Sequence, residues 1–117
     1  MKLKLYNRDE IFMINLDSVL FFKAEDHYTS VYYGKDIKQL LPFGLSQLVK
    51  SINELPDYKD MFARLGRSHL LNIHNIVHAS VVKETVTMLS KDGSFVSLHI
   101  PRVVIKEMLE KEKIAKQ

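Results

Sequence analysis

The chain of 117 residues contains no cysteine and no tryptophan, and it has only four glycines. Without cysteine it has no disulfide, no thiolate metal ligand and no cysteine nucleophile, and it suits a reducing compartment, so we expect a cytoplasmic protein. Four glycines leave little backbone free to cradle a phosphate. No run approaches the roughly 20 apolar residues of a membrane span. Residues Met1–Arg8 lack the apolar core of a signal peptide.

Patterns that indicate catalysis or metal binding are also missing. A serine nucleophile requires a sharp G-x-S-x-G turn, and the nearest match, Gly44–Leu48, lacks the second glycine. His74 and His78 would share one face of a helix, as zinc ligands often do, but the isoleucines and valines around them favour strand and turn. Glu25 and Asp26 are adjacent, so on a strand they point to opposite faces. We therefore expect no enzyme, no metal, no cofactor and no small-molecule substrate.

Charge and length point to one domain with a polyanionic partner. With 46% hydrophobic and 26% charged residues, the chain falls in the range of ordinary globular domains. Its length suits a single domain over residues 1–117. The net charge of +3 fits a nucleic-acid partner, because basic side chains release the counterions condensed on DNA. The lysines of Lys106–Lys116 alternate with glutamates, however, and equally suit a solvated helix face.

Most of the chain has the pattern of short strands separated by turns. Alternating apolar residues, or runs of β-branched and aromatic residues, predict strands at residues 2–5, 10–16, 19–22, 28–33 and 37–41. Tyr28 and Tyr32 share one face of their strand, which would also fit a platform for stacked single-stranded bases. A half-buried sheet surface explains the same residues more simply.

The clearest hairpin joins residues 83–89 to residues 95–100. A three-residue loop, Lys91–Gly93, with the glycine in the left-handed conformation, gives a consistent register. In that register Met88 pairs with Val96 and Val86 pairs with Leu98 on one face, and Thr87 pairs with Ser97 on the other. The hairpin is thus predicted to have one dry and one wet face.

Two segments have helical periodicity. Apolar residues at helical spacing predict an amphipathic helix over residues 45–54, and Pro56 stops it. A narrow apolar stripe predicts a last helix over residues 103–115, with Pro101 at its start. The predicted fold is mainly β, a compact antiparallel domain with these two short helices.

Three segments, in this order, carry a family resemblance. Val19–Thr29 is an apolar strand followed by an acidic-aromatic turn. Phe62–Ile76 contains the run F-x-R-x-x-R-S, then a ring residue, two apolar residues and asparagine. Asp92–Gly93 and then Leu98–Arg102 have the pattern of a turn, a final strand and an arginine-bearing loop before the last helix. Together these segments resemble the LytTR family of bacterial DNA-binding domains over nearly the whole chain.

The sequence departs from the family pattern at a few positions. Pro101 stands where the family usually has serine before the last helix. Gly66 stands where histidine is frequent, and His69 replaces the usual aromatic residue. These differences put the shape of the last loop and one polar contact in doubt.

The resemblance implies a function as well as a fold. Family members contact double-stranded DNA with loops that enter successive major grooves, and the duplex bends. Carried over by position, the candidates for contacting bases are Arg102, Arg67 and Thr29. The candidates for contacting phosphates or supporting loops are Arg64, Ser68, His27 and Asn72. The family tends to bind paired direct repeats, which implies two protomers on one site.

The arginines also have a case of their own. Arginine presents a fork of donors to O6 and N7 of guanine, a pairing worth roughly 1–3 kcal/mol of discrimination. Alternatively, Arg67 and Arg102 are solvated surface residues, or they pair with Glu25 or Asp26 in exposed contacts of small energy. Asn72 could equally hold a turn through its own backbone.

We therefore predict a sequence-specific DNA-binding transcription regulator. The alternative is a protein-interaction module of the same fold that binds or inhibits other regulators without DNA, and a hydrolase is disfavoured because no nucleophile and base can be nominated. Family members usually carry this domain behind a receiver domain, but this chain has no parallel β/α pattern of that kind. The methionine directly before the first strand favours a one-domain regulator.

Overall fold

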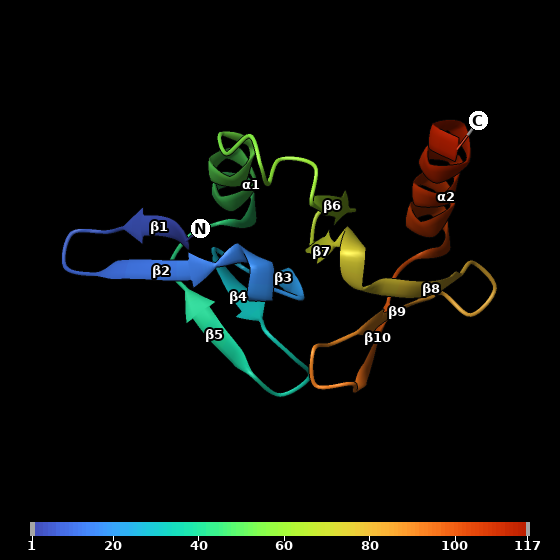
Figure 1. The fold of residues 1–117 in the computed structure, drawn as a ribbon, viewed down its shortest axis with the longest axis horizontal. Coiled ribbons are helices and arrows are strands. Elements are labelled where there is room, and N and C mark those ends of the chain that lie inside the picture. Colours follow the sequence, from blue (N-terminus) through green and yellow to red (C-terminus); the bar gives the residue numbers. More distant parts are fainter. Residues whose placement is uncertain (1, 117) are drawn as a thin grey trace.

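The computed structural model describes residues 2–116, and the side chains of residues 2–111. Every strand pair is antiparallel, and the strands form three sheets (Figure 1). The first sheet is the hairpin β1 (Lys2–Tyr6) and β2 (Ile11–Asn15). The second has the order β5 (Lys38–Leu41), β4 (Tyr28–Tyr32), β3 (Phe21–Glu25), β7 (His69–Asn72), β6 (Phe62–Leu65). The third has the order β10 (Phe95–His99), β9 (Thr85–Leu89), β8 (Ile76–Ser80).

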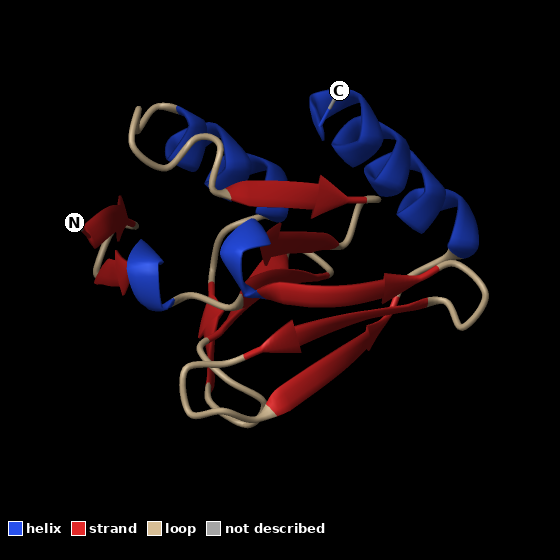
Figure 2. Ribbon diagram, turned by 45° about the vertical axis from the view of Figure 1, so that its right-hand side comes forward, coloured by secondary structure: helices blue, strands red, loops and turns tan. Residues whose placement is uncertain are grey.

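Two α-helices are described, and both are drawn toward the top of the view in Figure 2. They are α1 (Leu45–Asn53) and α2 (Arg102–Lys116), with β6 and β7 between them in Figure 1. Two short 3-10 helices, η1 (Leu16–Ser18) and η2 (Ile73–Asn75), follow β2 and β7. No described helix is both long enough and apolar enough to cross a membrane.

The five-stranded sheet lies between two hydrophobic cores. Successive residues of a strand point to opposite faces, so Phe22 belongs to one core and Phe21 to the other. On the Phe22 side the sheet packs with the β1–β2 hairpin and α1. On the Phe21 side it packs with the three-stranded sheet and α2, whose Ile105 is fully buried. The central sheet is therefore covered on both faces, and its turns are left at the edges.

The predicted hairpin is confirmed in its register. Met88 pairs with Val96, Val86 with Leu98 and Thr87 with Ser97. Val86, Met88 and Val96 are buried on one face of the hairpin. On the other, wetter face the hydroxyls of Thr87 and Ser97 lie 3.1 Å apart. Gly93 has φ +88°, the left-handed conformation that the loop requires.

The mainly β antiparallel class and both helices are confirmed. The strands β6 and β7 were not predicted, and the other differences are at the boundaries. The strand predicted at residues 19–22 is β3, which runs from Phe21 to Glu25 because η1 ends just before Val19. Asn15 caps η1 by accepting a hydrogen bond from the backbone N of Asp17 (3.3 Å). His74 and His78 lie in η2 and β8, as the prediction of turn and strand requires.

Candidate nucleic-acid interface

The turn between β6 and β7 presents Arg67 at the surface. Gly66 begins the turn with φ +64°, a conformation that glycine adopts without steric cost. Arg67 and Ser68 are both exposed. The backbone O of Ser68 accepts a hydrogen bond from the backbone N of Ala24 (2.7 Å), which fixes the turn to the end of β3. The Arg67 side chain is thus carried by a turn anchored at its base.

Arg64 supports this turn from β6. Its Nη1 and Nη2 each donate to Oγ of Ser46, in the first turn of α1, at 3.3 Å. Nη2 also donates to the backbone O of Arg67 at 3.4 Å. The guanidinium therefore connects α1 to the turn that carries Arg67.

Arg102 is the first residue of α2 and is exposed. Its backbone N donates to Oε2 of Glu84, in the turn between β8 and β9, at 2.9 Å. The backbone O of Pro101 accepts hydrogen bonds from the N atoms of Val104 and Ile105, at 3.0 and 3.1 Å. Pro101 therefore opens the helix as predicted, and it places Arg102 at the helix N-terminus.

The two arginine-bearing segments are neighbours although they are far apart in sequence. A hollow of about 250 Å³ lies between Leu65–His69 on one side and Ile100, Pro101 and Val104 on the other. A Cβ added at Gly66 would lie 3.6 Å from Cγ2 of Val104. We call the exposed residues Arg64, Arg67 and Arg102 the arginine edge. Folding gathers these three cations on adjoining elements.

His27 lies in the turn between β3 and β4 and is exposed. Asp26, beside it, has φ 62°, which a short polar residue tolerates in a tight turn. A Cβ added at Gly44 would lie 3.9 Å from the backbone O of His27, so this turn reaches the start of α1. Glu25, which was considered as an ion-pair partner for the arginines, accepts a hydrogen bond from Oγ of Ser30 at 2.9 Å.

The structure does not place Thr29 in a turn, where its predicted base contact would require it. Thr29 lies in β4 rather than in the turn, and it is fully buried. Its Oγ1 donates to the backbone O of Phe43 at 2.8 Å. Because the hydroxyl is enclosed and already bonded, it ties β4 to the segment before α1 and is not presented to a ligand.

Asn72 has the structural role that was left open. It is 1% exposed, and its Nδ2 donates to the backbone O of Val19 at 2.9 Å. Its Oδ1 accepts from the backbone N of His74 at 3.1 Å and so caps η2. Both ends of the amide are used inside the protein.

His69 is the first residue of β7, directly after the turn that carries Arg67, and it is half-buried. It pairs with Lys23 across β7 and β3, and its ring centroid is 6.4 Å from that of Phe21. Burial, and then the nearby Lys23 ammonium, lower the pKa of His69 below its ordinary value. The imidazole is therefore held in its neutral form at neutral pH.

Sequence reasoning missed Glu84 and Ser46. Each accepts a hydrogen bond from an arginine that lies 18 residues away in the chain. Capping motifs are recognised in a sequence by spacings of about three residues, so no local pattern signals either contact. Only the tertiary structure brings these acceptors to the arginine edge.

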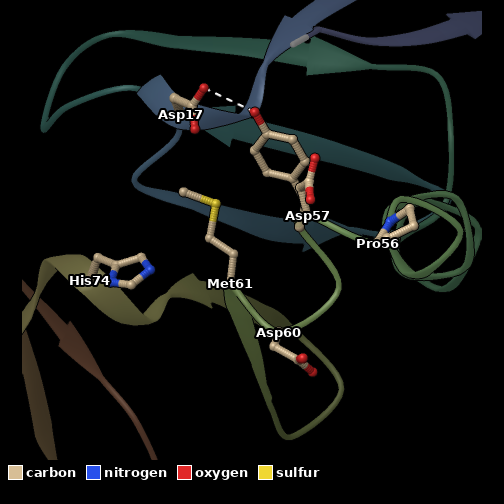
Figure 3. A pocket seen from close by; sticks show the side chains of 7 residues that line it. Asp17, Pro56, Asp57, Asp60, Met61 and His74 are labelled. Carbon is tan, nitrogen blue, oxygen red and sulfur yellow. Dashed lines mark hydrogen bonds between the residues drawn. The ribbon is translucent and has the colours of Figure 1, made fainter.

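A separate hollow of about 550 Å³ is rich in carboxylates (Figure 3). Asp17, Asp57 and Asp60 line it together with Pro56, Tyr58, Met61 and His74. The Tyr58 hydroxyl donates to Oδ2 of Asp17 at 3.0 Å, and this bond, followed by burial and the charges of Asp17 and Asp57, raises the pKa of Tyr58. Carboxylates repel phosphates, which makes this hollow unsuited to DNA. In the described part of the chain, no group of three or more histidine and acidic side chains is placed to hold a metal ion.

Comparison with known proteins gives a consistent result. The model of the LytTr DNA-binding domain family matches residues 9–111. Among solved structures, the chain is similar to the LytTr DNA-binding domain of a Bacillus cereus protein described as a methyl-accepting/DNA response regulator. That match has a TM-score of 0.60 at 19% identity and covers 93% of this chain and 94% of the other. No curated protein matches. The family match spans most of the chain, and the chain therefore belongs to the LytTR family of DNA-binding domains, which act in transcription regulation.

Proposed function

We propose that the chain recognises a specific double-stranded DNA sequence through the arginine edge, whose turns enter the major groove, and that it regulates bacterial transcription. The observation that carries the proposal is the placement of Arg67 and Arg102. Both are exposed, and the β6–β7 turn that carries Arg67 adjoins the start of α2, which carries Arg102, across one hollow. Turns project farther from the body of the domain than sheet strands do, so they suit entry into a groove.

The roles of the individual residues follow from their contacts. A guanidinium can bond O6 and N7 of guanine at once, and Arg67 and Arg102 are the candidates for this contact. Arg64 donates to Ser46 and to the Arg67 carbonyl, so it positions the turn. His27 and Ser68 are exposed on neighbouring turns and are candidates for phosphate contacts, which orient a protein without discriminating sequence.

The size of the domain is compatible with contacts in two successive major grooves. Its longest dimension is 45 Å, whereas successive major grooves on one face of B-DNA are about 34 Å apart. We also propose that two protomers occupy paired repeats on one DNA site. This arrangement predicts a selected motif with two equivalent halves.

The test begins with a pool of random duplexes, from which those that bind the purified chain at near-physiological salt are selected and sequenced. Enrichment of a paired motif supports the proposal, and the enriched duplex then serves as the probe for variants. Weak, salt-sensitive binding without enrichment contradicts it and favours the protein-interaction module.

Variants then assign the arginines. We expect Arg67→Ala and Arg102→Ala each to lower discrimination by about 1–3 kcal/mol, roughly 5–150-fold, with thermal unfolding unchanged. The matched control is Arg8→Ala, because Arg8 is exposed in the β1–β2 turn, far from α2 in Figure 1. Unchanged discrimination in both arginine-edge variants would overturn the assignment of the site.

A further inference from the structure

Glu84 holds the segment that carries Arg102 on both sides of Pro101. The backbone O of Glu84 accepts a hydrogen bond from the backbone N of Ile100 at 3.0 Å. Its side-chain Oε2 accepts from the backbone N of Arg102 at 2.9 Å. One residue of the β8–β9 turn thus accepts hydrogen bonds from the residues immediately before and immediately after the proline. The direction in which β10 passes into α2 depends on these two bonds.

The backbone of Glu84 has an unusual conformation. Its φ is 52°, in the left-handed region that residues with a Cβ adopt at a steric cost. The backbone N of Glu84 donates to the O of Val81 at 3.3 Å and closes the turn. In this conformation the carbonyl and the carboxylate of one residue both face the junction of β10 and α2, as the two bonds require.

The side-chain bond supplies what the local sequence cannot. The first N–H groups of an α-helix have no partner within the helix, and a side-chain oxygen from the residue before the helix usually accepts one of them. Pro101 occupies that place and has no side-chain acceptor. The Glu84 carboxylate takes over this function from another turn, and its negative charge suits the positive end of the helix dipole.

We propose that Glu84 is the positioning residue that sets how Arg102 meets a base, an inference that rests on the proposed function of the arginine edge. The carboxylate already occupies the start of α2, so this helix N-terminus is not a phosphate site. Glu84 contributes nothing attractive to DNA itself, because a carboxylate near the phosphates opposes binding. Its contribution is therefore to discrimination between sequences and not to overall affinity.

These opposite effects separate a positioning role from a purely structural one. In Glu84→Ala we expect discrimination at the base that depends on Arg102 to fall about tenfold. Affinity for an unrelated duplex should stay equal or rise, since a negative charge is removed. In Glu84→Gln the amide oxygen can still accept from the Arg102 N–H, so most of the discrimination should return. A variant that merely loosened the fold would lower both affinities together.

A glycine variant controls for a folding defect caused by the substitution at residue 84. Glu84→Gly also removes the carboxylate, but glycine adopts positive φ without steric cost, so the turn is kept. We expect the same loss of discrimination in the glycine and alanine variants. Amide hydrogen exchange of Arg102 in the free protein should be faster in both than in wild type, which tests the hydrogen bond without DNA.

The decisive measurement is a double-mutant cycle with Arg102→Ala on the duplex enriched from the random pool. If Glu84 acts through Arg102, then Glu84→Ala has no further effect on discrimination in the Arg102→Ala background. An additional loss in that background, or an equal loss in Glu84→Gln, overturns the positioning role. If Arg102→Ala lowers discrimination and Glu84→Ala does not, this inference fails and the proposed function stands. If no motif is enriched, or neither Arg67→Ala nor Arg102→Ala lowers discrimination, the proposed site itself fails and this inference with it. If Arg102→Ala alone has no effect, this inference fails and the site is confined to Arg67.

Discussion

Replacement of Asn72 by alanine distinguishes a residue that supports the fold from one that contacts DNA. The substitution removes the donor to the Val19 carbonyl and the acceptor for the His74 N–H. The His74 N–H can bond to water, because His74 is exposed, whereas Val19 is 1% exposed and its carbonyl is left without a partner. A buried polar group without a partner costs about 1–3 kcal/mol, and a net hydrogen bond contributes about 0.5–1.5 kcal/mol. We therefore expect Asn72→Ala to lower the free energy of unfolding by about 2–4 kcal/mol.

Urea denaturation followed by circular dichroism measures this loss. With an m-value of about 2 kcal/mol per molar urea, the midpoint should fall by roughly 1–2 M. Asn75→Ala is the matched control, because Asn75 is the last residue of the 3-10 helix that Asn72 caps, and it makes one exposed bond, from Nδ2 to the Leu89 carbonyl at 2.9 Å. Its midpoint should fall by less than half as much. Equal midpoints for the two variants, with DNA binding weakened only in Asn72→Ala, would refute the structural role.

Two further predictions concern pH. Hydrogen bonds from Ser90 and Ser94 hold the pKa of Asp92 at about 2, below its ordinary 3.8, so its stabilising effect is complete above pH 3.8 and is lost as the pH falls toward 2. Asp92→Asn should flatten the pH dependence of the unfolding midpoint in that window, and an unchanged slope would contradict the cause given. Burial and Lys23 lower the pKa of His69 from 6.5, so the unfolded chain binds the proton first and stability falls as the pH drops below 6.5. His69→Tyr should remove this fall, and an acid titration of the thermal midpoint that matches wild type would count against it.

Much of the fold follows from local patterns in the sequence. The alternation of Leu3 and Leu5 with lysines and the apolar spacing in α1 each reflect one buried face of an element. The register of β9 and β10 follows from a loop whose length and glycine permit one pairing. These features depend on neighbours close in the chain, and a sequence displays such neighbours directly.

The site was predictable only in part. Arg67 and Arg102 were identified by motif, and both are exposed, Arg67 on the β6–β7 turn and Arg102 at the start of α2. Thr29 was assigned to a turn by the family resemblance, although the predicted strand over residues 28–33 already contained it, and in β4 its hydroxyl is buried and bonded. Sequence patterns indicate where a strand lies more reliably than where it ends, since the end depends on which partner strand is available.

What the sequence determined by itself is the class of the fold, the family and the arginines that mark its candidate site. The tertiary structure decided which polar groups form hydrogen bonds inside the protein and which remain exposed to a partner. Asn72 and Thr29 are bonded to backbone groups 53 and 14 residues away, and Glu84 reaches Arg102 across 18 residues. The bonds of Asn72 and Thr29 form because a buried backbone group must find a partner where packing excludes water, and packing brings together residues that no local pattern relates.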